Sequence, residues 1–198
     1  MKIGLIIGST RPNRFADTAA NWVREGAITR MDIELEVLDL RDQDLPFFAE
    51  PVSPSFTNGV YSHPAAEAWR RKIGGCDGFI ATVAEYNHGP TAVLKNALDS
   101  AFVEWRRKPF AFVGYGGVGA ARAIEQLRQI VAELQMAPIK YEVNVGLEPF
   151  LGVLRGEKAL SDFDFLNNSR AAMFDDLIWW ARALKSARDR PHQSQAAA

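Results

Sequence analysis

The chain has 198 residues, of which 47% are hydrophobic and 24% are charged, and its formal net charge is −1. A chain of this length buries roughly 70% of its unfolded surface, so it can form a substantial core without disulfides or metals. A net charge near zero creates no long-range field for a polyanion, which argues against nucleic acid as a partner.

Cysteine and histidine usage predicts neither a disulfide nor a metal site. Cys76 is the only cysteine, and His63, His88 and His192 are far apart in the sequence. The apolar N-terminal run ends at Ser9, too early for a signal peptide. No stretch approaches the ~18 apolar residues of a membrane span. We therefore expect a cytoplasmic protein that has no membrane partner.

Short apolar runs alternate with amphipathic segments along the chain. We expect strands at 2–8, 32–40, 77–83, 108–116 and 138–146, and helices at 16–29, 64–74, 91–104, 118–136 and 161–187. Residues 41–62 and 147–160 are predicted loops, and the start of the last helix could instead be an irregular turn. This alternation predicts an α/β fold with a doubly wound, five-stranded parallel sheet and helices on both faces, a three-layer αβα architecture. We expect a single domain over 1–187 and a disordered tail over 188–198.

Three unusual turns each follow a predicted strand: "GSTRPNRF" (8–15), "AEYNHG" (84–89) and "GYGGVG" (114–119). In a doubly wound sheet, ligands bind outside the carboxyl ends of the strands, near a switch in strand order. The three turns are therefore predicted to lie at one edge of the sheet and to form a site.

The first turn has the composition of a phosphate site. It offers a flexible glycine, two hydroxyls and two cations before a helix start: Gly8, Ser9, Thr10, Arg11 and Arg14. It lacks the Gly-Lys-Ser/Thr of a Walker loop and the three glycines of a dinucleotide fingerprint, so a monophosphate fits better than a pyrophosphate. The alternative is an ordinary capped helix, with Asp17 or Asn13 as N-cap and solvated arginines.

The third turn formally contains G-x-G-x-x-G at Gly114, Gly116 and Gly119, but no acid ends the next strand, which makes a dinucleotide site a weak interpretation. We expect Gly116, Gly117 and Gly119 to clear room for a flat ligand. The alternative is close helix–strand packing. Arg122 could contact a ligand or lie on the surface.

Four blocks together carry a family resemblance: Gly8–Pro12, Glu85–Gly89, Leu94–Asp99, and Gly116-Gly117 with Arg122-Ala123. In order and spacing over most of residues 1–145, the chain resembles the NADPH-dependent FMN reductase family of the flavodoxin-like fold. It departs from the family at Ala84, where proline is usual, and at Pro90, which comes one place early and leaves Thr91 in the gap. A turn that is looser or differently shaped is therefore expected.

The resemblance implies FMN as cofactor and assigns residues to it. Around the phosphate it places Ser9, Arg11, Arg14, Ala16, Asp17 and Thr18. Around the ring it places Glu85, Tyr86, Asn87, His88, Gly116 and Gly117, with Arg122 nearby. Lys95 and Asn96 would hold the turn and the helix start rather than touch the flavin.

The implied activity is a ping-pong cycle in which NADPH or NADH passes a hydride to flavin N5, and a small acceptor then takes it. No side chain needs to be a nucleophile or an obligate general acid. The acceptor could be a quinone, free flavin, an azo or nitro compound, or a metal oxyanion. Arg11, Arg14 and Arg122 could favour NADPH. The alternatives are a flavodoxin-like electron carrier and a flavin-free scaffold with a degraded site.

Aromatic residues outnumber what a small core readily absorbs, which favours a homodimer or homotetramer. The residues in question are Phe47, Phe48, Phe56, Phe102, Trp105, Trp179 and Trp180. The resemblance points the same way, since the family commonly forms dimers in which the neighbouring chain helps to wall the flavin. The alternative is one well-filled core.

Overall fold

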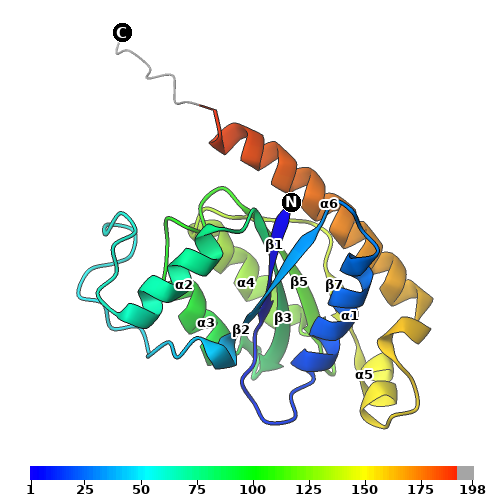
Figure 1. Cartoon of the computed structure of the whole chain (residues 1–198). Coiled ribbons are helices and arrows are strands. Elements are labelled where there is room, and N and C mark those ends of the chain that lie inside the picture. The colour runs from blue at the N-terminus through cyan, green and yellow to red at the C-terminus, as the bar shows by residue number, and fades with distance from the viewer. Residues whose placement is uncertain (191–198) are drawn as a thin grey trace.

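The computed structural model describes residues 1–190 and is built around a parallel sheet (Figure 1). The strands are β1 (Lys2–Ile7), β2 (Glu34–Asp39), β3 (Gly78–Tyr86), β5 (Pro109–Tyr115), β6 (Ala137–Pro138) and β7 (Val143–Val145). Their spatial order is β2-β1-β3-β5, and β6 and β7 both pair with β5 in parallel. The order switches between β1 and β3, as in flavodoxin-like sheets, so the predicted fold class is confirmed.

The sheet has seven strands rather than the five expected. The predicted strand at 138–146 is split into β6 and β7, because Arg128 of α4 (Ala121–Glu133) takes two of the intervening carbonyls. Its guanidinium donates to Ile139 O at 2.7 Å and to Lys140 O at 3.2 Å. The extra strand is β4 (Gly89–Pro90), a two-residue antiparallel partner of β3.

Helices cover both faces of the sheet (Figure 1). α1 (Ala16–Ile28) and α6 (Asp164–Arg188) lie on one face, and α2 (Pro64–Gly74), α3 (Ala92–Asp99) and α4 lie on the other. Each face has its own hydrophobic cluster. Every residue of β5 is buried, as expected for a central strand between two helical layers.

The segment predicted as a loop at 147–160 contains α5 (Leu147–Leu154) and a 3-10 turn at Leu160–Asp162. Pro149 is compatible with this helix because it lies in the first turn, where its missing N–H has no intrahelical partner. The irregular start considered for the last helix is confirmed. α6 ends at Arg188, one residue inside the expected tail, and residues 191–198 lie outside the described residues.

The aromatic surplus is partly absorbed by the core. Trp105 is fully buried, with its ring centroid 4.8 Å from that of Phe79, so its expected exposure was wrong. Phe47 and Phe56 in the 41–62 segment are 82% and 78% exposed, and Trp179 on α6 is 63% exposed. Of the aromatic residues in question, those that are exposed therefore lie in that segment and on α6.

None of the helices within residues 1–190 is both long and apolar enough to cross a bilayer. Over the same range, no three His, Cys, Asp or Glu side chains are grouped so that they could hold a metal ion. His192 lies outside the described residues.

Candidate functional site

The three turns meet at the carboxyl edge of the sheet and surround a cavity of about 270 Å³. Six predicted site residues line it: Ser9, Arg11, Arg14, Glu85, Tyr86 and Gly116. The other lining residues are Asn13, Phe15, Ala84, Tyr115, Phe150 and Leu154. The remaining candidates lie beside these in the chain: Ala16, Asp17 and Thr18 begin α1, Asn87 and His88 form a turn tip, Gly117 follows Gly116, and Arg122 lies in the first turn of α4.

The bend after β1 is held by two buried hydroxyls. The N–H of Gly8 donates to Thr82 Oγ1 at 3.1 Å, and Thr91 Oγ1 donates to the Gly8 carbonyl. A Cβ on Gly8 would collide with the Thr82 carbonyl oxygen, so only glycine fits. Thr91 also caps α3 by accepting from the Leu94 N–H at 3.2 Å. The looser connection expected from Thr91 is therefore not what the structure contains.

The start of α1 has no side-chain cap. The helix begins at Ala16 after Phe15, and neither Asn13 nor Asp17 serves as N-cap, so the capped-helix alternative was wrong. The first N–H groups of a helix have no intrahelical partner and carry a partial positive charge. This end of α1 therefore has the donors and the polarity that favour an anionic group.

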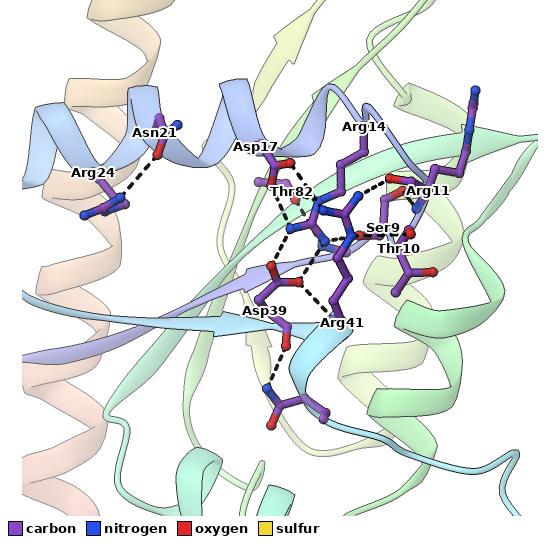
Figure 2. A network of polar contacts seen from close by, with 12 residues as sticks. Ser9, Thr10, Arg11, Arg14, Asp17, Asn21, Arg24, Asp39, Arg41 and Thr82 are labelled. Atoms are coloured by element: carbon purple, nitrogen blue, oxygen red, sulfur yellow. Dashed lines mark hydrogen bonds and ion pairs between the residues drawn. The ribbon is translucent and has the colours of Figure 1, made fainter.

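Arg14 does not present a free cation to the cavity. Its side chain is 2% exposed and lies between two carboxylates, with Nη1 2.7 Å from Asp39 Oδ1 and Nε 2.8 Å from Asp17 Oδ1 (Figure 2). Nη1 also donates to the Ser9 carbonyl. Hydrogen bonding to Asp39 raises the pKa of Arg14, which keeps it charged. The guanidinium is thus used within the protein.

Arg41 was missed by the sequence analysis. Its guanidinium donates to the carbonyls of Thr10, with Nε 3.4 Å from the oxygen, and of Arg11. The available signal was its place directly after the predicted strand at 32–40. By contrast, the Arg11 side chain points away from this network (Figure 2), and its guanidinium carbon lies 6.0 Å from the centroid of the Tyr86 ring.

The second turn is a tight hairpin between β3 and β4. Asn87 and His88 have φ of 53° and 72°, as both central residues of a type I′ turn require. Glu85 fastens this hairpin to α4. Its carboxylate pairs with the Arg122 guanidinium and accepts from the N–H groups of Arg122 at 3.2 Å and Ala123 at 3.4 Å.

Arg122 completes the support of this hairpin, since its Nη1 lies 3.0 Å from His88 Nε2. Burial acts to raise the pKa of Glu85, but the hydrogen bonds from Arg122 and Ala123 outweigh it and lower the net pKa. Glu85 therefore remains a carboxylate that holds the turn. Like Arg14, Arg122 pairs with a carboxylate, although its side chain is 49% exposed.

The glycines of the third turn divide into two kinds. A Cβ on Gly114 would collide with the Gly119 carbonyl, and one on Gly119 would lie 2.7 Å from Asn144 Cβ. The close-packing interpretation holds for these two, so the expectation that Gly119 clears room for a ligand was wrong. Gly116, with φ of 122°, and Gly117 would place a Cβ in open space.

One wall of the cavity is aromatic and was not predicted. The Phe15 ring lies 5.1 Å from the Tyr115 ring and 4.8 Å from the Phe150 ring, between centroids. Burial raises the pKa of Tyr115, so its hydroxyl stays protonated. Tyr115 could have been found from its place at the end of a strand. Phe150 was missed because α5 was predicted as a loop.

Asn96 holds the 41–62 segment rather than the turn that precedes its helix. Its side-chain amide donates to Pro46 O at 2.8 Å and accepts from the Phe48 N–H at 2.8 Å. Lys95 pairs with Asp99 one helical turn away, at 2.6 Å. Neither residue lines the cavity.

The chain is similar to known reductases. A family model described as NADPH-dependent FMN reductase matches residues 1–149. An NAD(P)H-dependent FMN reductase of Schizosaccharomyces pombe is 39% identical over 135 residues, or 68% of each chain. A 2-hydroxy-1,4-benzoquinone reductase of a Burkholderia species is 29% identical over 143 residues, which cover 69% of this chain and 73% of that one. FerB of Paracoccus denitrificans, a flavoenzyme NAD(P)H:(acceptor) oxidoreductase, shares the fold with a TM-score of 0.72, covering 92% of this chain and 97% of its own at 18% identity.

Proposed function

The chain belongs to the NADPH-dependent FMN reductase family, and on that premise we propose that the cavity between its three turns is the FMN site. The protein is an oxidoreductase that uses FMN and NAD(P)H. Membership of this family favours a reductase over the flavodoxin-like carrier and over the flavin-free scaffold.

One observation carries the assignment of the site. Gly117 lacks a side chain although nothing in the protein would obstruct a Cβ there, and a Cβ at Gly116, whose φ of 122° itself favours glycine, would also meet open space. Gly116 borders the cavity together with Tyr86 and the turn before the uncapped helix α1. Open space beside an aromatic ring suits a flat ring system, and a helix N-terminus suits a phosphate. FMN has both parts.

In this proposal the residues divide the binding between them. The Ser9 hydroxyl, the Arg11 guanidinium and the N–H groups at the start of α1, which includes Ala16, Asp17 and Thr18, hold the phosphate. Tyr86, the backbone of Asn87 and His88, and the space at Gly116 and Gly117 hold the ring, while Glu85 and Arg122 keep the hairpin in place. When bound, FMN supplies the hydride chemistry, and the chain contributes orientation and the exclusion of water.

We further propose that the acceptor is a quinone. The Burkholderia relative is named as a benzoquinone reductase, and the cavity is bordered by Phe150 and by Leu154, which is 57% exposed. An apolar rim suits a small aromatic acceptor better than a metal oxyanion. We expect kcat/KM for a benzoquinone to exceed that for free FMN by about tenfold or more. The reverse order would make free flavin the acceptor.

We also propose that a second copy of the chain covers the exposed side chains of the 41–62 segment, among them Phe47 and Phe56. Light scattering after size-exclusion chromatography is expected to give two or four times the chain mass of 22.0 kDa. A monomer at micromolar concentration would contradict this proposal.

The FMN site is tested by visible spectroscopy of the purified protein after FMN is added and unbound flavin is removed. We expect a bound-flavin spectrum that bleaches rapidly when NADPH or NADH is added without oxygen. Bound flavin that neither nucleotide bleaches would indicate an electron carrier, and a colourless protein would contradict the site.

A further inference from the structure

The peptide groups of the first turn are oriented by two arginines that lie on its β2 side. Arg14 donates to the Ser9 carbonyl, and Arg41 donates to the carbonyls of Thr10 and Arg11 (Figure 2). Three consecutive carbonyl oxygens therefore face guanidinium groups. Carbonyls of a surface turn ordinarily bond to water, so this arrangement fixes a turn that would otherwise adapt its shape.

Carbonyl orientation also determines where the neighbouring N–H groups point. In a planar trans peptide, the carbonyl of one residue and the N–H of the next point in opposite directions. Holding the Ser9 and Thr10 carbonyls toward the guanidinium groups therefore directs the N–H groups of Thr10 and Arg11 away from β2. The Thr10 N–H is presented on the open side of the turn, and the Arg11 N–H donates to Ser9 Oγ at 3.4 Å, which fixes that hydroxyl as well.

Asp39, the last residue of β2, holds both arginines. Its carboxylate accepts from both terminal nitrogens of Arg14, with Nη1 at 2.7 Å, and from the backbone N–H of Arg41 at 2.9 Å. Its own carbonyl accepts from Gln43 Nε2 at 2.6 Å. Parallel pairing of β2 with β1 sets Asp39 opposite Ile7, the residue directly before the turn.

We propose that Asp39 is a positioning residue for the cofactor phosphate. Through Arg14 and Arg41 it fixes the peptide groups of residues 9–11. Asp39 therefore strengthens the binding of the phosphate even though the two negative charges repel each other. This inference rests on the proposed FMN site. It assigns Arg14 to the support of the turn. If Arg14 instead contacted the phosphate directly, Asp39 and the phosphate would compete for the same guanidinium.

These two roles predict opposite signs for one substitution. If Asp39 competes with the phosphate for Arg14, Asp39→Asn removes a repelling charge and tightens FMN binding. If Asp39 positions the turn, the same change weakens FMN binding. Asp42 provides a matched control, because it is an exposed acid three residues further along and its change to asparagine alters the net charge equally.

The experiment measures dissociation constants by quenching of flavin fluorescence, for both FMN and riboflavin, which lacks the phosphate. For Asp39→Asn we expect FMN binding to weaken by at least about tenfold while riboflavin binding stays within about twofold, because only the phosphate contacts are lost. Asp42→Asn should bind FMN as the unchanged protein does, or slightly more tightly. Unchanged or tighter FMN binding by Asp39→Asn would overturn the proposal.

Folding is controlled separately, because removing one member of a buried ion pair destabilises a protein. Asp39→Glu keeps the charge and should recover part of the lost FMN affinity. If Asp39→Asn does not fold, Asp39→Glu carries the test, because it moves the carboxylate without removing its charge. It should bind FMN more weakly than the unchanged protein while riboflavin binding stays within about twofold, and full FMN affinity in this variant would overturn the proposal. Failure of the unchanged protein to bind FMN would instead contradict the site itself.

Discussion

The two edges of the sheet both contain buried or partly buried charges, but those charges have different neighbours. At the carboxyl edge, Arg14 and Asp39 lie beside the cavity and act on the peptide groups of a turn. At the amino edge, Asp77 and Lys108 are buried among the ends of helices. The same kind of interaction therefore supports the proposed ligand site at one edge and the packing of layers at the other.

The amino edge shows how buried charges support the packing of layers. Lys108 Nζ donates to the carbonyls of Ile73, at 2.9 Å, and Gly74, at 3.1 Å, which end α2. A cation there satisfies carbonyls that have no helical partner. Asp77 accepts from the Lys2 N–H at 3.1 Å and from Lys185 Nζ of α6 at 2.6 Å. Substitutions at the two edges should therefore separate cofactor binding from stability.

The largest effect is expected from Gly117→Val at the carboxyl edge. A side chain there meets open space in the protein but would occupy the proposed ring site, so FMN binding should weaken by about tenfold to a hundredfold, or about 1–3 kcal/mol. Fluorescence quenching measures this change, and the melting temperature of the protein without FMN should stay the same.

The matched control for this variant is Gly119→Val in the same turn. Gly119 has φ of 61°, and its Cβ would crowd Asn144, so this variant should lose stability in denaturant unfolding. If both variants only lower the melting temperature, the distinction between the two kinds of glycine is wrong.

These glycines also show how far the sequence could predict the site. Gly114, Gly116, Gly117 and Gly119 lie in one short motif, and spacing cannot tell a glycine that avoids a neighbour from one that leaves room for a ligand. That distinction depends on neighbours such as Asn144, which comes from a different strand, and not on backbone φ, which is positive at both Gly116 and Gly119. The location of the turn was predictable from the strand before it, whereas the role of each glycine was not.

The network around Arg14 was unpredictable for a related reason. Its partner Asp39 is 25 residues away, and the two meet because β2 pairs with β1 in one particular register. A single sequence indicates the strands through their apolar runs but not the register between them. The alternation of strands and helices was predictable, except for α5, where Pro149 resembled a loop signal.

A smaller effect is expected from Asp77→Asn at the amino edge. Burial acts to raise the pKa of Asp77, but hydrogen bonds from Lys185 and the Lys2 N–H lower its net pKa. We expect the free energy of unfolding to fall by about 1–3 kcal/mol at neutral pH, with unchanged FMN affinity.

The sign of this contribution follows from the pH dependence of the free energy of unfolding. A carboxyl whose pKa is lower in the folded state stabilises the protein above its unfolded pKa of about 4, and this contribution disappears as pH falls through the folded value. Denaturant unfolding should therefore show that Asp77→Asn loses less stability than the unchanged protein on acidification below about pH 4. Equal acid sensitivity in the two proteins would rule out this contribution.

The smallest effect concerns the stability of the protein at alkaline pH, which depends on two residues of the same edge. Burial lowers the pKa of Lys108 to about 8 and raises the pKa of Cys76 to about 12. Between pH 8 and 9 the unfolded chain binds more protons at residue 108 than the folded chain, so stability should rise with pH, by at most about 1.4 kcal/mol per unit. Above pH 9 the folded chain keeps a Cys76 proton that the unfolded chain loses, which gives the opposite slope.

Two variants separate these slopes in denaturant unfolding between about pH 8 and 10.5. Cys76→Ala should continue to gain stability up to about pH 10.5, whereas Lys108→Met should lose the initial rise and show only the decline above about pH 9. If stability still rises with pH in Lys108→Met, another group causes the rise. FMN affinity should stay within about twofold in both variants, because neither residue reaches the carboxyl edge and the charge that shapes the cofactor turn comes from Asp39.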